Sequence, residues 1–111
     1  MPDFISFIEY DGQARKTALP ELDIMPNHVF WMLGLQGEVG ELFEKVKKIY
    51  RDSDGVIDKE AISKELGDIL WYWNQVVHSF GLFPEQVARE NLVKLAERQT
   101  NGTLQGNGDN R

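Results

Sequence analysis

The sequence predicts an all-α protein, because apolar residues recur at helical spacing and capping residues divide the chain into four such segments, while no segment alternates as a strand does. A chain of 111 residues supplies one hydrophobic core. We therefore expect a single domain over residues 1–100, arranged as a four-helix bundle, and a polar, glycine-rich tail over residues 101–111.

The first two helices are separated by a loop with two prolines. The first is expected over residues 3–17, where apolar side chains recur at helical spacing (Phe4, Phe7, Ile8). The prolines mark residues 19–27 as the loop. Asn27 is expected to cap the second helix, which runs to about Tyr50.

The last two helices carry clear start and stop signals. Residues 51–55 form a turn by composition, and Asp58 is expected to cap the third helix, which Gly81 ends. Pro84 suits the first position of a fourth helix, which reaches about Gln99.

Composition excludes several classes of function. Twelve basic against eighteen acidic residues give a net charge of −6, which argues against binding a long nucleic acid through its phosphates. The absence of cysteine excludes a disulfide framework, a thiolate metal site and a cysteine nucleophile. Because the chain shows neither a long apolar run nor the pattern of a secretion signal, we expect a cytoplasmic protein with no membrane partner.

Two pairs of acidic residues share the same spacing. Glu38 and Glu41 lie three residues apart in the second predicted helix, and Glu65 and Asp68 repeat that spacing in the third. Residues three apart are neighbours on a helix surface, and both pairs lie beside apolar residues. If the two helices are antiparallel neighbours, four carboxylates face one another and repel, and a bound divalent cation removes that conflict.

The ligand type then selects the metal. Oxygen ligands without cysteine or histidine suit Mg²⁺, with Mn²⁺ as a substitute, better than Zn²⁺. A di-iron bundle requires histidines three residues after glutamates, and neither histidine of this chain has that position.

The fourth predicted helix carries the opposite charge. Asn91, Lys94 and Arg98 fall on one side of it, and Lys48 near the end of the second helix adds a further ammonium group. Hydrogen-bond donors beside an acidic metal cluster are what a polyphosphate requires.

In this order the motifs resemble those of the MazG-like all-α nucleoside triphosphate pyrophosphohydrolases. The family signature is Glu-x-x-Glu on one helix, Glu-x-x-Asp on the next and a downstream Asn-x-x-Lys-Leu-x-x-Arg, which residues 38–41, 65–68 and 91–98 match. The closing GNGDNR is similar to tails of small, often phage-encoded, single-domain members. The resemblance implies Mg²⁺-dependent hydrolysis of nucleoside triphosphates, here dNTPs, between the α and β phosphates, giving a monophosphate and pyrophosphate.

The resemblance also implies roles for individual residues. The metal ligands would be the four acids (Glu38, Glu41, Glu65, Asp68), with Glu41 or Glu38 acting catalytically and Glu41 preferred as the general base. The phosphates would be bound by basic and amide groups (Lys48, Asn91, Lys94, Arg98) and the base by aromatic residues (Trp31, Trp71, Tyr72). Arg111 in the tail would be a further substrate-binding residue. The assembly would be a homodimer or a dimer of dimers. The tail is expected either to be disordered or to form a lid or a partner-subunit contact with its last residues (Asp109, Asn110, Arg111).

Three questions stay open at this stage. The chain has Gly37 where many relatives have a further acid, which leaves the number of metals undecided. The same pattern also fits a non-catalytic acidic helical module, or a hydrolase of another phosphoanhydride such as phosphoribosyl-ATP. Finally, Gly34, Gly37 and Gly40 weaken the helix that holds two of the acids, so we expect them to serve close packing or access of a phosphate.

Overall fold

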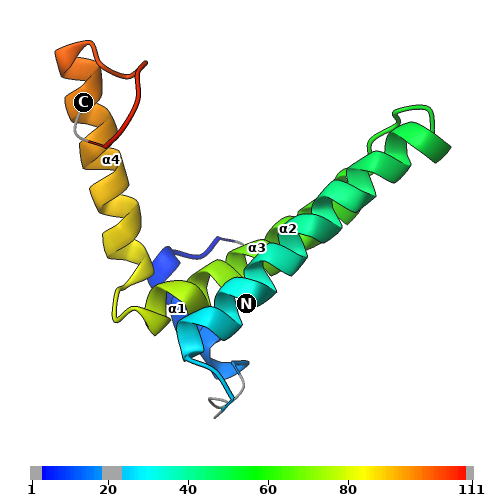
Figure 1. Ribbon diagram of the computed structural model, residues 1–111, viewed down its shortest axis with the longest axis horizontal. Coiled ribbons are helices and arrows are strands. Elements are labelled where there is room, and N and C mark those ends of the chain that lie inside the picture. The colour runs from blue at the N-terminus through cyan, green and yellow to red at the C-terminus, as the bar shows by residue number, and fades with distance from the viewer. Residues whose placement is uncertain (1–3, 19–23, 110–111) are drawn as a thin grey trace.

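The computed structural model describes residues 4–18 and 24–109, and these residues form four α-helices and no strand (Figure 1). In chain order the helices are α1 (Phe7–Lys16), α2 (Asn27–Asp52), α3 (Lys59–Ser79) and α4 (Pro84–Asn101). The predicted all-α class and the number of helices are confirmed. Within the described ranges, no helix is long and apolar enough to cross a membrane.

The long helices α2 and α3 form an antiparallel hairpin (Figure 1). The turn between them uses positive φ at Asp54 and Gly55. Asp58 caps α3 as expected, because its carboxylate accepts a hydrogen bond from the backbone N–H of Ala61 at 3.2 Å. The expected cap of α2 is wrong, since Pro26 occupies that position and Asn27 is the first helical residue.

The other two helices differ slightly from their expected bounds. Helix α1 begins after Ser6, whose hydroxyl accepts from the backbone N–H of Glu9 at 3.2 Å, so its start is four residues later than expected. Pro84 opens α4 as predicted, and the left-handed Gly102 ends that helix two residues beyond its expected end.

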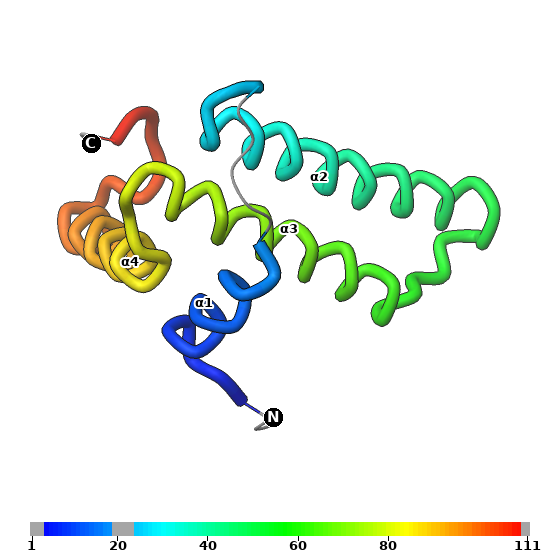
Figure 2. The backbone as a smooth tube through the Cα atoms, turned by 90° about the horizontal axis from the view of Figure 1, so that it is seen from below, coloured from blue at the N-terminus to red at the C-terminus, as the bar shows by residue number. Residues whose placement is uncertain are grey.

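The four helices do not close around one common core. Helices α1 and α2 lie on opposite sides of α3 (Figure 2). Helix α4 projects away from the end of α3 (Figure 1). Helix α4 contacts α1 and α3, but across the part of the chain that the structure describes it does not contact α2. The hairpin and α4 therefore present two separate faces in one subunit.

The glycines of α2 serve different purposes. At Gly34 the ring of Tyr72 from α3 packs directly against the helix backbone, and an added Cβ would lie 2.8 Å from Tyr72 Cζ and nearer still to Cε1. At Gly37 and Gly40 an added Cβ would meet nothing within 4 Å. Close packing thus explains Gly34 within this subunit, whereas Gly37 and Gly40 face open space.

Candidate metal centre

Three carboxylates converge between the two helices of the hairpin. Glu38 on α2 and the pair Glu65 and Asp68 on α3 each offer an oxygen, and these oxygens all lie within 4.8 Å of one another. The antiparallel course of α2 and α3 produces this arrangement, because it brings the middle of each helix opposite the middle of the other. Glu65 is the most enclosed of the three, at 9% exposure.

The buried oxygens of this cluster have unused acceptor capacity. Glu65 Oε1 accepts from Lys45 Nζ at 2.9 Å, but Glu65 Oε2 and Glu38 Oε2 are both buried without a hydrogen-bond partner. A buried carboxylate oxygen left unpaired is costly. An all-oxygen donor set of this kind fits a hard divalent cation such as Mg²⁺ or Mn²⁺.

Electrostatic repulsion is visible at Glu38. Burial raises the pKa of its carboxyl group, and the neighbouring charges of Glu41, Asp68 and Glu65 raise it further. Glu41 itself is exposed and lies outside the group of three, next to Glu38. Three of the four predicted metal ligands are therefore brought together, and the fourth stands at the edge of the cluster.

A stability measurement checks this repulsion. Because the pKa of Glu38 is raised on folding, its ionised form lowers the free energy of unfolding above that pKa, and the penalty disappears at acid pH where the group is protonated in both states. We expect Glu38→Gln, in EDTA at pH 7, to raise the melting temperature by a few degrees, with the gain shrinking toward pH 4. The matched control Glu60→Gln, an exposed acid on α3, should change little at either pH. A lower melting temperature for Glu38→Gln at pH 7 would contradict the repulsion.

The predicted basic residues of α4 are held by the tail. Asp109 Oδ1 lies 3.2 Å from Lys94 Nζ and 3.3 Å from Arg98 Nη2, and Arg98 Nη2 also donates to the carbonyl of Gly108 at 3.2 Å. The ammonium group of Lys94, and to a smaller extent the guanidinium group of Arg98, hold the pKa of the Asp109 carboxyl group below its usual range. Arg98 is only 6% exposed. In this subunit the tail therefore contacts α4 through Asp109, whereas Asn110 and Arg111 lie outside the described residues.

One subunit does not bring this basic stripe to the acidic cluster, because α4 does not contact α2 among the described residues. Asn91 is exposed on α4. Lys48 is also exposed, and it lies ten residues beyond Glu38, or about 15 Å along the helix.

The predicted aromatic residues form one cluster between α2 and α3. The ring centroid of Trp31 lies 5.6 Å from that of Trp71 and 6.1 Å from that of Tyr72. The ring centroids of Trp71 and Tyr72 are 5.0 Å apart. Trp31 is 6% exposed, and the Trp71 indole N–H donates to Thr17 Oγ1 at 2.8 Å. Trp31 is thus almost fully buried, whereas Trp71 and Tyr72 retain partial exposure.

Sequence reasoning missed two groups beside the acids. Lys45 forms the ion pair with Glu65, and it follows Glu41 by four residues and Glu38 by seven. This helical spacing predicts that Lys45 lies on the same side of α2 as the two acids. Tyr10 of α1 carries a raised pKa, caused by burial and then by the charge of Asp68. No local pattern signals Tyr10, because its position depends on how α1 packs on α3.

Comparisons with known proteins agree with the order of motifs. The MazG nucleotide pyrophosphohydrolase domain model matches residues 27–103. The chain is also similar to the Gene 37 protein of Mycobacterium phage L5, with 46% identity over 82 residues that cover 71% of this chain and 72% of the phage protein. No solved structure matches. The match spans the helices that carry all three converging acids, and the chain belongs to the MazG nucleotide pyrophosphohydrolase domain family.

Proposed function

We propose that this chain hydrolyses nucleoside triphosphates, with deoxynucleotides as the physiological class, between the α and β phosphates, in a Mg²⁺-dependent reaction that gives a nucleoside monophosphate and pyrophosphate. The observation that carries the proposal is the cluster of Glu38, Glu65 and Asp68, with its two buried and unpartnered oxygens, inside a MazG domain. Such substrates belong to the cytoplasm, which is the location we propose.

We assign each acid a role from its position in the cluster and its exposure. Glu38, Glu65 and Asp68 would hold the cation, and Glu41 would complete the set from its edge. The bound cation supplies charge neutralisation for the triphosphate and makes the attacking water more acidic. Glu41 is exposed and lies beside the cluster, which suits it to accept the proton of that water as general base.

The phosphates require a second subunit under this proposal. Because α4 does not reach α2 within the described chain, Lys94 and Arg98 would bind the triphosphate held by a partner, after it displaces Asp109. Large apolar side chains are exposed on both faces, Phe43 on α2 and Leu92 on α4 among them, which supports a homodimer or a dimer of dimers. Lys48, Asn91 and Arg111 remain proposed substrate contacts, and Trp71 and Tyr72 remain proposed aromatic contacts of the nucleoside.

Product analysis tests the reaction. We expect a panel of NTPs and dNTPs, incubated with the protein and Mg²⁺, to yield monophosphate and pyrophosphate, and EDTA to stop turnover. Diphosphate and orthophosphate as products would contradict cleavage between the α and β phosphates. If only phosphoribosyl-ATP is hydrolysed, that compound is the substrate. If no compound is hydrolysed, the result favours the non-catalytic acidic module.

A further inference from the structure

A polar cavity lies apart from the acidic cluster, where α1, the start of α2 and the end of α3 meet. Its volume is about 390 Å³, which falls in the range of small-molecule sites. Six of its lining residues are polar or charged (Arg15, Asn27, His28, Gln75, His78, Ser79), and the ring of Trp31 adds an apolar wall.

The cavity and the acids share one side of the hairpin. Trp31 precedes Glu38 by seven residues on α2, and Gln75 follows Asp68 by seven on α3. Seven residues are almost two full turns, so each cavity residue lies on the same side of its helix as the acid, displaced by about 10 Å along the axis. A nucleotide whose phosphates bind at the acids would place its base about as far from them as the cavity lies.

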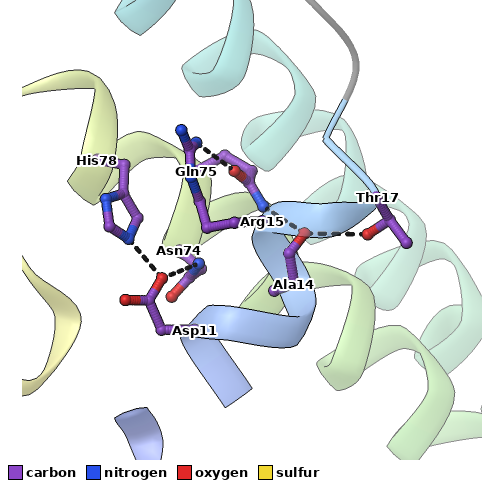
Figure 3. Close-up of polar contacts among 7 residues, drawn as sticks. All are labelled: Asp11, Ala14, Arg15, Thr17, Asn74, Gln75 and His78. Atoms are coloured by element: carbon purple, nitrogen blue, oxygen red, sulfur yellow. Dashed lines mark hydrogen bonds and ion pairs between the residues drawn. The ribbon is translucent and has the colours of Figure 1, made fainter. Parts of the chain in front are cut away.

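Two buried amides hold the cavity wall in place. Asn74 and Gln75 are both 0% exposed, and burying polar side chains costs folding free energy unless they form hydrogen bonds. Gln75 Oε1 accepts from Arg15 Nη1 at 3.0 Å, while Gln75 Nε2 donates to the carbonyl of Ala14 at 3.3 Å (Figure 3). Both the oxygen and the nitrogen of the Gln75 amide are thus hydrogen-bonded, and Gln75 holds Arg15 at the cavity.

The second amide acts through its nitrogen, since Asn74 Oδ1 is buried without a hydrogen-bond partner. Asn74 Nδ2 donates to Asp11 Oδ1 at 3.1 Å, and the same oxygen pairs with the Nε2 atom of His78 (Figure 3). The ring of His78 is therefore held from α1 and α3 together. Recognition groups supported by buried hydrogen-bonded residues are typical of a preorganised binding site.

We propose that this cavity binds the base of the nucleotide, with Arg15 as the residue that reads it and with Gln75 and Asn74 as positioning residues; this rests on the proposed function. A guanidinium donates bidentately to two adjacent acceptors. Guanine presents N7 and O6, and cytosine presents N3 and O2, as adjacent acceptors. In adenine the N1 and N7 acceptors each lie beside the N6 amino donor, and in thymine both carbonyl acceptors lie beside N3–H. The site therefore favours dGTP and dCTP over dATP and dTTP.

Variants at two neighbouring positions of α1 test this reading. We expect Arg15→Gln to reduce the ratio of kcat/KM for dGTP or dCTP to that for dATP by about tenfold, mainly through KM. Lys16→Gln, which removes the same charge from the exposed neighbouring position, should leave the ratio unchanged. An equal loss for all four nucleotides, or an unchanged ratio, would overturn the assignment of Arg15.

Binding of products separates this inference from the proposed reaction. Calorimetric titration of dGMP, dCMP and dAMP in EDTA requires neither metal nor hydrolysis. We expect dGMP or dCMP to bind more tightly than dAMP, and Arg15→Gln to abolish that difference; this result would support the cavity even if no triphosphate were hydrolysed. Equal affinities for the three monophosphates in the wild-type protein would overturn it. If Arg15→Gln fails to fold, the same titration is made with Asn27→Ala, another residue that lines the cavity, and unchanged affinities for all three monophosphates would overturn the site.

Discussion

Asp68→Asn is expected to lower kcat/KM for every nucleoside triphosphate by at least about a hundredfold, because a charged metal contact stabilises the transition state by several kcal/mol. The substitution keeps the shape of the side chain and removes one of the three converging negative charges. Since those charges repel one another, the melting temperature measured in EDTA should not fall. Steady-state rates, circular dichroism and size-exclusion chromatography together check this result.

The matched control is Glu60→Gln, which removes one charge from an exposed position on the same helix. It should retain full activity and the same assembly. Turnover near the wild-type level in Asp68→Asn would remove this residue from the metal centre, and a parallel loss in the Glu60 control would assign the effect to overall charge.

Glu41→Gln separates the two roles left to that residue, because the structure places it beside the group of three acids. If Glu41 is the general base, kcat falls while the Mg²⁺ concentration required for half-maximal rate is unchanged. If Glu41 is a ligand, the required Mg²⁺ concentration rises as well. Unchanged kinetics would exclude both roles.

The local features of the fold were predictable from sequence. Asp58 and Pro84 mark helix starts through their own chemistry, and the repeated three-residue spacing placed Glu38 opposite Glu65 and Asp68 once α2 and α3 were taken as antiparallel. These inferences need only the geometry of one helix and one turn.

Features that depend on packing between helices were not predictable. The direction of α4 depends on the turn after α3 and on contacts with α1, so the sequence alone did not show that Lys94 and Arg98 stand away from the acids of their own chain. Asn74 and Gln75 are polar residues in a helix, and only the crossing of α1 buries them. Local propensity carries no information about either arrangement.

Gly34→Ala tests the close approach of α2 and α3. Alanine is the better helix former, yet its Cβ would overlap the Tyr72 ring, which also contacts the rings of Trp31 and Trp71. Overpacking of this kind costs about 1–3 kcal/mol, so we expect a lower free energy of unfolding in urea at unchanged m-value. The cost should shrink in a Tyr72→Leu background, since the two substitutions share one contact.

Gly37→Ala and Gly40→Ala are the matched controls, because the same methyl group enters open space on the same helix. Each should raise the free energy of unfolding by about 0.5–1 kcal/mol through helix propensity alone. Equal effects at all three glycines would contradict the special role of Tyr72. A loss of stability at Gly37, together with a smaller assembly in size-exclusion chromatography, would instead place a second subunit against the side of α2 next to Glu41, since residues four apart are neighbours on a helix. The proposed reaction needs the basic stripe of a partner on that side.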